Sequence, residues 1–262
     1  MRFFVTKDYA ELSQVMMHQM LVRMYNPAPR VNIASTTGRT PIDGYRLLAE
    51  QVRDKPWFDN VHYYVFDEFW IHDPEGGPDV PICRVSLDAK YLDAAHVPDD
   101  HVHMLTYDNW ETTDERLAAE GGLDTVIMGV GTNGHFTGNQ PGTFSSWDEG
   151  THAVPILESP ADTVTHVVET ILHEDFHTDD MSLLPEFYIT MGPATIMGAR
   201  HIIFILSGEE KAETVRRAFF EPITTDFPVS IFQLHPDVTV ILDEAAASQV
   251  RDRLSHRDVG QR

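Results

Sequence analysis

The segment VIMGVGTNGHFTGNQPG, residues 126–142, joins an apolar run to a glycine-rich turn with a histidine at its centre. Gly129, Gly131 and Gly134 match the G-x-G-x-x-G pattern of dinucleotide-binding folds. That pattern requires a helix directly after the glycines, whereas two further glycines and a proline follow here. We therefore predict a loop whose glycines let the backbone approach a ligand closely, and which presents His135 at its rim.

Similar apolar runs alternate with helix-like segments along the whole chain. Several runs are continuous stretches of Val, Ile, Met and Phe, as in parallel strands that are buried on both faces of a sheet. The alternation predicts an α/β fold, one domain over residues 1–262, with a doubly wound, mainly parallel sheet and helices on both faces. The predicted strands are 3–6, 31–35, 62–67, 125–131, 187–192, 201–208 and 238–243, and the predicted helices lie around 8–25, 41–53, 112–120, 209–220 and 243–254. Residues 70–82 and 141–162 are rich in turn formers and are predicted to be long loops.

Composition and charge limit the classes of partner. The chain of 262 residues carries a formal net charge of −22, which is unfavourable for binding nucleic acid or an anionic membrane. The single cysteine, Cys83, cannot form an internal disulfide, and the N-terminal segment turns polar too soon for a signal peptide. No run reaches the ~18 apolar residues that a membrane helix needs. These features predict a cytoplasmic protein, in which an anionic ligand needs a local binding site.

Four predicted strand ends carry polar residues, and fold-level rules place ligands where the carboxyl ends of the strands meet. The turn STTGRTP, residues 35–41, leads into a helix, and such a hydroxyl-rich helix start is typical of an anion site. An ordinary helix cap gives the same pattern. We refer to residues 36–40 as the threonine loop; its candidate anion ligands are Thr36, Thr37, Gly38, Arg39 and Thr40.

Two further strand ends carry ionisable groups. Asp67 and Glu68 end a predicted buried strand, where an acidic pair is costly unless it is used or paired. We predict that Asp67 faces the ligand as a base; the alternative is a solvent-exposed cap. Lys211 lies in the first turn of a predicted helix, where a cation is unfavourable unless it meets an anion. A solvated surface lysine is the alternative there.

These motifs together resemble the glucosamine-6-phosphate deaminase/isomerase family, which shares its fold with the 6-phosphogluconolactonases. TGRTP at 37–41 is similar to the family's T-G-G-T-P loop, and YVFDEF at 64–69 to its F-N-M-D-E-Y strand end. Residues 129–141 resemble G-V-G-N-D-G-H-I-A-F-N-E-P. FQLHP at 232–236 is close to the family's L-Q-L-H-P, and SGEEKA at 207–212 resembles the segment of its phosphate-binding lysine. The resemblance covers nearly the whole chain in the same order.

The resemblance implies an amino-sugar 6-phosphate deaminase/isomerase in carbohydrate metabolism. In this chemistry the sugar ring opens, a carboxylate moves a proton between C2 and C1, and ammonia leaves. Asp67 would be that carboxylate, His135 would shuttle a proton during ring opening, and the threonine loop with Lys211 would hold the phosphate. Further substrate-binding candidates are Glu68, Gly129 and Gly131. The resemblance implies a small-molecule sugar phosphate as partner, no metal or organic cofactor, and suggests a homo-oligomer.

The sequence departs from the family pattern around the histidine and the phosphate. Asn133 and Gln140, which we count among the catalytic candidates, stand where the deaminases have Asp and Glu. Those acids orient and charge the histidine in the family, and an amide can fix a histidine tautomer but cannot offset the charge of an imidazolium. The resemblance also places a phosphate-binding arginine near residues 172–180, where none occurs. Arg39, in place of a family glycine, is a candidate to supply that charge.

Two other functions fit the same motifs. A 6-phosphogluconolactonase-like hydrolase shares the fold and needs no acid at Gln140, and a non-catalytic sugar-phosphate-binding paralogue would tolerate both amides. A separate motif, HEDFH at 173–177, matches the H-E-x-x-H pattern of zinc hydrolases. Because no third ligand follows it, we expect a solvated helix or lid end there.

Overall fold

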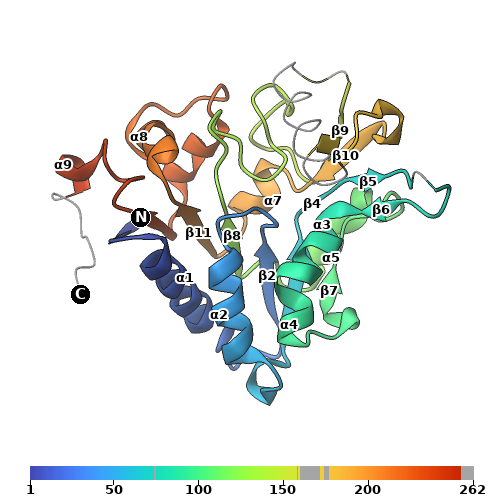
Figure 1. Ribbon diagram of the computed structural model, residues 1–262, viewed down its shortest axis with the longest axis horizontal. Helices are drawn as coiled ribbons and strands as arrows, with labels where there is room; N and C mark the ends of the chain where they lie inside the picture. Colours follow the sequence, from blue (N-terminus) through green and yellow to red (C-terminus); the bar gives the residue numbers. More distant parts are fainter. Residues whose placement is uncertain (74, 158, 160–171, 174–176, 255–262) are drawn as a thin grey trace.

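The protein is described by a computed structural model, in which residues 1–73, 75–157, 159, 172–173 and 177–254 are placed. Its centre is a seven-stranded sheet in the order β1-β12-β11-β8-β2-β3-β7, and every neighbouring pair is parallel (Figure 1). The strands are β1 (Arg2–Thr6), β2 (Val31–Ser35), β3 (Val61–Val65), β7 (Val102–His103), β8 (Thr125–Met128), β11 (His201–Leu206) and β12 (Val238–Asp243). The predicted doubly wound, mainly parallel fold is confirmed.

Helices cover both faces of this sheet, and Figure 1 shows α1, α2 and α4 side by side on one of them. The helices on that face are α1 (Tyr9–Met24), α2 (Ile42–Val52), α3 (Ile82–Leu87), the π-helix η2 (Asp88–Leu92) and α4 (Asp93–Ala95). The other face carries α5 (Thr113–Ala119), α7 (Pro193–Met197), α8 (Ala212–Phe220), the 3-10 helix η8 (Pro228–Leu234) and α9 (Arg251–Leu254). Short 3-10 helices complete the chain at η1 (Pro56–Phe58), η3 (Asp99–His101), η4 (Trp110–Thr112), η6 (Met181–Leu183) and η7 (Glu209–Lys211).

The continuous apolar runs follow from this two-sided burial. In β11, Ile203 and Ile205 pack in the core beneath α1 and α2, whereas Phe204 and Leu206 pack in the core beneath α8. Successive side chains of a strand point to opposite faces, so a strand with helices on both sides needs apolar residues at every position. This requirement made the central strands easy to recognise in the sequence.

Small antiparallel sheets were not predicted. One has the order β4-β10-β9, formed by β4 (Asp67–Glu68), β10 (Phe187–Thr190) and β9 (His152–Pro155), and the other pairs β5 (Trp70–Ile71) with β6 (Val80–Pro81). The predicted strand 187–192 therefore forms, but it joins the small sheet instead of the central one. The predicted long loops 70–82 and 141–162 contain β5, β6 and β9. Strands of two to four residues are too short to show a period in the sequence.

Several predicted boundaries need correction. The predicted strand 62–67 stops at Val65, and Asp67 belongs to β4. The predicted strands 125–131 and 201–208 end at Met128 and Leu206, because the chain turns away from the sheet at the segments 129–131 and 207–208, which contain glycine. The predicted helix 243–254 is mostly turns, with only α9 helical. A helical stretch over 82–95 was missed altogether, although its buried residues repeat at helical spacing.

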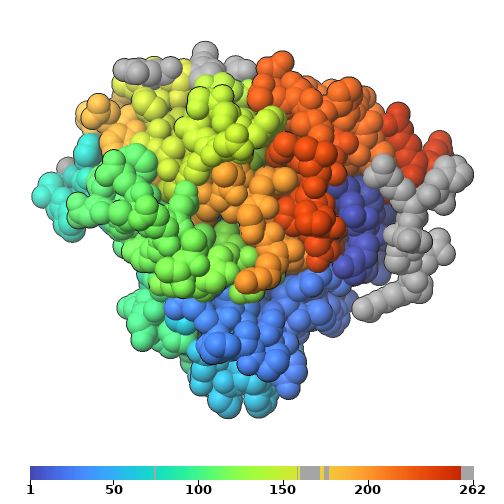
Figure 2. All heavy atoms as spheres, turned by 180° about the vertical axis from the view of Figure 1, so that it is seen from behind, coloured from blue at the N-terminus to red at the C-terminus, as the bar shows by residue number. Residues whose placement is uncertain are grey.

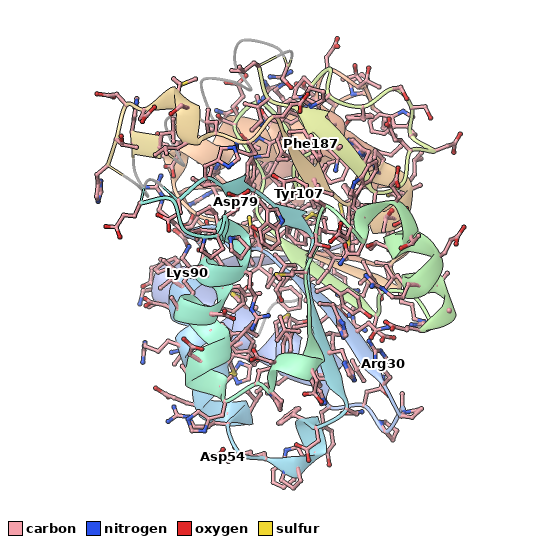
Figure 3. All side chains as sticks on the ribbon, turned by 90° about the vertical axis from the view of Figure 1, so that its right-hand side faces the viewer. Arg30, Asp54, Asp79, Lys90, Tyr107 and Phe187 are labelled. Carbon is pink, nitrogen blue, oxygen red and sulfur yellow. The ribbon has the colours of Figure 1, made fainter. Side chains whose placement is uncertain are left out.

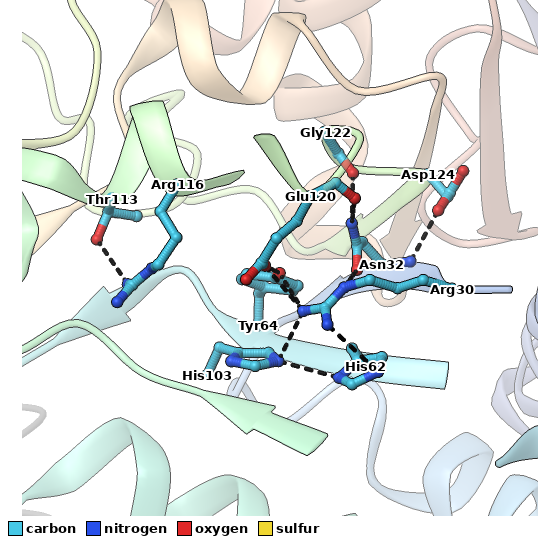
Figure 4. A network of polar contacts seen from close by, with 10 residues as sticks. All are labelled: Arg30, Asn32, His62, Tyr64, His103, Thr113, Arg116, Glu120, Gly122 and Asp124. Carbon is cyan, nitrogen blue, oxygen red and sulfur yellow. Dashed lines mark hydrogen bonds and ion pairs between the residues drawn. The ribbon is translucent and has the colours of Figure 1, made fainter. Parts of the chain in front are cut away.

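A polar network closes the amino ends of β2, β3 and β7 (Figure 4). The Arg30 guanidinium donates to the Tyr64 hydroxyl and the Glu120 carboxylate, both at 2.8 Å. It also contacts Nε2 of His103 at 3.0 Å, and His103 contacts Nδ1 of His62 at 3.1 Å. These contacts lie at the opposite end of the strands from Asp67, and they tie three strands to the chain before β8.

The carboxyl ends of the central strands carry the loops with the predicted functional residues. On the reverse side of the molecule, the yellow-green loop after β8 lies beside the orange segment that contains α8 and η8 (Figure 2). The Val229 N–H donates to the Gly134 carbonyl at 2.9 Å and joins the two segments. Among the placed residues, no helix combines the length and the apolar character required to cross a membrane.

Candidate active site

Asp67 lies where the chain leaves the central sheet for the small one. In β4 it pairs with Thr190 of β10, which runs antiparallel to it. Its Oδ1 accepts a hydrogen bond of 2.6 Å from the Thr190 hydroxyl and one of 2.7 Å from the Gly138 N–H. The side chain keeps partial exposure. The carboxylate is therefore fixed by two donors in a residue that is not fully buried.

Burial raises the pKa of Asp67 to about 7, and its hydrogen bonds from Thr190 and Gly138 lower the pKa and so oppose the effect of burial. A carboxyl with this pKa is a mixture of carboxylate and acid at neutral pH, so it can both accept and return a proton. Perturbed carboxyls of this kind concentrate at functional sites. The pKa and the geometry thus agree with a base at this position.

His135 is held by a chain of two amides. Asn133 Oδ1 accepts from the backbone N–H of His135 at 3.2 Å and contacts its Nδ1 at 2.7 Å. Because a backbone N–H can only donate, the Asn133 atom facing it is the oxygen, and Nδ1 of His135 must carry a proton to donate as well. Asn133 Nδ2 donates in turn to Gln140 Oε1 at 3.2 Å. The neutral imidazole then has its lone pair on Nε2.

Two glycines of the loop make room for this arrangement. A Cβ on Gly131 would lie 2.1 Å from the His135 ring, and a Cβ on Gly134 would lie 2.5 Å from the Phe227 ring. Gly134 also has a φ of 84°, which favours glycine. A Cβ on Gly129 would meet nothing within 4 Å, so close approach does not explain that residue. No helix follows these glycines before β9, in agreement with the rejection of a dinucleotide site.

Gly138 connects the loop after β8, residues 129–141, to Asp67; we refer to this segment as the histidine loop. Its N–H donates to Asp67 and to the Thr190 hydroxyl, and its carbonyl accepts from the Tyr188 hydroxyl at 2.6 Å. A Cβ on Gly138 would lie 2.5 Å from the Tyr188 ring. The backbone at Gly138, three residues after His135, is therefore fixed directly against the carboxylate of Asp67.

The threonine loop follows β2 and leads into α2. The Thr36 N–H donates to the carbonyl of Ile127 in β8 at 3.1 Å, which places the loop beside the start of the histidine loop. The Gly38 N–H reaches Thr36 Oγ1 at 3.3 Å, and Pro41 directly precedes the first turn of α2, as predicted. Arg39 is exposed. The loop thus lies next to the histidine loop, on the neighbouring strand.

Lys211 also reaches the histidine loop. Its Nζ donates to the Val130 carbonyl at 2.8 Å, and burial lowers its pKa. The turn before it is fixed by Asp243, whose carboxylate accepts from the Gly208 N–H at 2.9 Å and from the Ser207 hydroxyl at 2.5 Å. Val130 lies between Gly129 and Gly131, so the ammonium lies close to both.

The structure therefore brings most of the predicted site residues to one edge of the sheet. Glu68 is the exception: it is fully buried and points to α3, where it accepts from the N–H groups of Cys83 (2.7 Å) and Arg84 (3.0 Å). Successive residues of a strand face opposite sides, so Glu68 cannot share the position of Asp67. Burial raises its pKa to about 8. Our expectation that Glu68 binds substrate is replaced by a role in holding α3.

The HEDFH motif does not form a metal site among the described residues. Its Glu174 lies outside them, while His177 has a φ of 53° and is not helical. His173 pairs with Asp179 at 3.1 Å, and both side chains are exposed. In the placed part of the chain, no three His, Cys, Asp or Glu side chains gather as ligands.

Sequence reasoning missed Gly138, Thr190 and Lys90. Thr190 is a threonine in an otherwise apolar strand, which is a weak signal. Gly138 was grouped with turn-forming glycines, and Lys90 lies in the helical stretch that was missed; its Nζ donates to the Thr37 carbonyl. Their positions depend on pairings across more than 50 residues.

Comparison with known proteins decides the family. A glucosamine-6-phosphate deaminase of Shouchella clausii (strain KSM-K16) is 31% identical over 256 residues, which cover 95% of this chain and 97% of that protein. The chain belongs to the glucosamine-6-phosphate deaminase family. A second family member, from Bifidobacterium longum (strain NCC 2705), is 30% identical and covers 97% of this chain and 93% of its own length. No family model matches the chain.

Solved structures support the same fold. A monomeric glucosamine-6-phosphate deaminase of the NagB superfamily superposes with a TM-score of 0.75 at 24% identity, covering 95% of this chain and 100% of that one. The 6-phosphogluconolactonase of Trypanosoma brucei superposes with a TM-score of 0.66 at 20% identity, covering 95% and 98%. The solved deaminase and the solved lactonase thus share this fold.

Proposed function

We propose that this chain is an amino-sugar 6-phosphate deaminase/isomerase that converts glucosamine 6-phosphate, or a close isomer, to a ketose 6-phosphate and ammonia. The observation that carries the proposal is the contact of Asp67, whose pKa is about 7, with the Gly138 N–H of the loop that presents His135. Asp67 can then move protons on the carbon atoms of a substrate, while the neutral imidazole of His135 moves protons on the oxygen atoms of the same substrate. The relatives named above support the choice of substrate.

Ring opening falls to His135. With Nδ1–H donated to Asn133, Nε2 accepts the proton of the C1 hydroxyl. The C1–O5 bond breaks, the electrons of the O–H bond form the C1 carbonyl, and the imidazolium returns the proton to O5. The histidine ends neutral, so no net proton is consumed.

Isomerisation falls to Asp67. Its carboxylate removes the C2 proton of the open-chain amino aldehyde, the ammonium group at C2 gives a proton to the C1 carbonyl oxygen, and the electrons of the C2–H bond form an enolamine with a hydroxyl at C1. The protonated Asp67 returns the proton to C1, which gives a protonated C2 imine. Water adds to C2, the nitrogen takes both protons of that water and leaves as ammonium, and the ketose phosphate remains. A pKa near 7 suits both halves of this transfer.

The phosphate would bind at the threonine loop and Lys211. In the described part of the chain, the N–H groups of Thr37 and Thr40 have no protein acceptor and can donate to an anion. Lys211 supplies a positive charge, and the lowering of its pKa by burial makes a bound anion favourable for its charged form. Arg39, exposed at the same loop, is the proposed substitute for the arginine that residues 172–180 lack.

The amides Asn133 and Gln140 set the rate of ring opening in this proposal. They fix the tautomer of His135 but leave the transient imidazolium without a neighbouring anion. In a serine protease, replacing the aspartate beside the catalytic histidine by asparagine costs about 10⁴ in rate. A smaller loss is expected here, because the proton stays on the imidazole only until it reaches O5.

A coupled ammonia assay over hexosamine 6-phosphates tests the proposal. The wild type should release ammonia from at least one of them, and Asp67→Asn should lower kcat by about 10² or more, as for a lost general base. Asp100→Asn, an exposed aspartate in the segment before β7, is the matched control and should have wild-type activity. No ammonia from any hexosamine 6-phosphate would contradict the proposal.

A lactonase function is the second candidate, supported by the neutral Asn133–Gln140 pair and by the lactonase neighbours in fold. His135 would then activate water for attack on 6-phosphogluconolactone. Rapid lactone hydrolysis without ammonia release would favour it. A non-catalytic sugar-phosphate binder would be stabilised against heat by a hexose phosphate without turnover of either substrate, and Asn133→Asp with Gln140→Glu would then create activity.

We also propose the domain organisation, partners, location and assembly of the protein. Relatives that match nearly the whole chain support one domain over residues 1–262. The net charge of −22 opposes nucleic acid and membrane partners, and one buried cysteine, Cys83, suits the reducing cytoplasm. We keep a homo-oligomer as the expected state, which light scattering after size exclusion would test.

A further inference from the structure

The carbonyl oxygens of the threonine loop accept hydrogen bonds from side chains that hold the loop in place. Three side chains on the face of the sheet that α1 and α2 cover donate to three of these oxygens, one from each of α1, α2 and η2. The pairs are Tyr9 hydroxyl to Thr40 carbonyl (2.9 Å), Tyr45 hydroxyl to Thr36 carbonyl (2.8 Å) and Lys90 Nζ to Thr37 carbonyl. A carbonyl and the N–H of the same peptide unit point in opposite directions, so the contacts to the Thr36 and Thr37 carbonyls direct the N–H groups of the next residues, Thr37 and Gly38, away from the donating side chains. The Thr40 carbonyl precedes Pro41, which has no N–H, so the contact from Tyr9 fixes the backbone only.

Lys90 is the charged member of this set. It lies on η2, above Asp54 and on the opposite side from Arg30 in the view of Figure 3. Its Nζ also donates to the Ser86 hydroxyl at 2.7 Å, one helical turn earlier. The ammonium is partly buried, and its charge lies directly against the Thr37–Gly38 peptide unit.

The helix that carries Lys90 is fixed next to the proposed base. Glu68, the residue after Asp67, accepts from the N–H groups of Cys83 and Arg84 in the first turn of α3. α3 runs directly into η2, so the helical segment links the neighbourhood of Asp67 to the threonine loop. Tyr91, next to Lys90, stacks on Tyr45 with ring centroids 5.1 Å apart and supports the same connection.

We propose that Lys90 is a positioning residue for the substrate's phosphate group. It holds the Thr37 carbonyl and so fixes the backbone of the threonine loop, whose Thr37 and Thr40 N–H groups would face the phosphate. It also places a positive charge beneath the loop in a protein whose net charge of −22 repels anions. This inference rests on the proposed binding of a sugar phosphate. It predicts that loss of Lys90 weakens phosphate binding and leaves proton transfer at Asp67 and His135 intact.

The test compares Lys90→Ala, Lys90→Arg and the control Lys55→Ala. Lys55 lies in the hollow with Val61 and His101 at the other end of the strands, so its variant makes the same change in net charge. Lys90→Ala should raise KM for glucosamine 6-phosphate about tenfold or more, as expected for one lost charged hydrogen bond. Its kcat should change less than about threefold. Lys90→Arg, which keeps the charge and donors, should recover most of the loss, and Lys55→Ala should match the wild type.

Inorganic phosphate provides a readout that does not depend on turnover. Its dissociation constant, from thermal shift or calorimetry, should rise about tenfold in Lys90→Ala and stay unchanged in Lys55→Ala. Unchanged KM and phosphate affinity in a folded Lys90→Ala protein would overturn the inference, as would an equal loss in kcat. If the wild type shows no ammonia release but Lys90→Ala still weakens phosphate binding, the proposed reaction fails and the role of Lys90 stands.

Discussion

Replacing Thr190 by valine tests whether Asp67 acts as a base with a tuned pKa. The Thr190 hydroxyl donates to Asp67 Oδ1 at 2.6 Å, and this hydrogen bond lowers the pKa of Asp67 against the effect of burial. Valine has nearly the shape of threonine but cannot donate. The Gly138 N–H remains as a donor at 2.7 Å, so the Thr190→Val variant removes one of two hydrogen bonds to the carboxylate.

The size of the effect follows from that single bond. A hydrogen bond to a charged group contributes about 1.5 to 3 kcal/mol, and about 1.4 kcal/mol corresponds to a tenfold change in proton affinity. At the lower end, the pKa of Asp67 rises from about 7 to about 8. The ionised fraction at pH 7 then falls from about one half to about one tenth, which lowers kcat/KM roughly fivefold.

The assay is the pH dependence of kcat/KM for ammonia release between about pH 5.5 and 9.5. The acid limb of the profile should move to higher pH in Thr190→Val. The kcat/KM values of the two enzymes should converge at high pH, where Asp67 is ionised in both. Thr190→Ser keeps the hydroxyl and should keep the wild-type limb. A limb that stays in place in Thr190→Val, or moves to lower pH, would refute a tuned carboxylate at position 67.

Two further substitutions test the loop and the network at the other end of the strands. Gly138→Ala should lower the free energy of unfolding by about 1–3 kcal/mol through overcrowding and reduce activity, whereas Gly129→Ala, whose Cβ meets nothing within 4 Å, should be tolerated in denaturant titrations. Burial and Arg30 lower the pKa of His62 to about 4, below its ordinary value of 6.5. The neutral His62 therefore contributes to the free energy of unfolding above pH 6.5, and this contribution is lost as the pH falls toward 4. His62→Asn should reduce the drop in Tm between pH 7 and pH 5, and the exposed His18→Asn should not; equal drops in all three proteins would contradict this.

The central sheet could be predicted because burial on both faces leaves a strong local signal. β2 and β12 were predicted with the bounds that the structure has. The small antiparallel sheet could not, because β4 has two residues and pairs with β10, a segment more than 100 residues further along the chain. The helical stretch 82–95 was hidden by turn-forming residues just before it, and its start depends on Glu68, a contact that no local pattern contains.

The site was predicted in outline for a related reason. Asp67, His135 and Lys211 follow strands of one sheet, so the rule for carboxyl ends placed them at one edge. That rule could not separate Asp67 from Glu68, because both follow the same strand and only the pairing with β10 decides which one faces the loop. It also could not supply Gly138 or Lys90, whose contacts with Asp67 and Thr37 depend on the packed fold.

A crystal structure of the Asp67→Asn variant with glucosamine 6-phosphate tests the central claim most directly, because the variant should bind the sugar without consuming it. The account predicts C2 of the sugar within about 3.5 Å of the side chain at position 67, the C1 and ring oxygens at Nε2 of His135, and the phosphate at the threonine loop beside Lys211. A sugar whose C2 lies beyond reach of position 67, or a phosphate bound elsewhere, would contradict it.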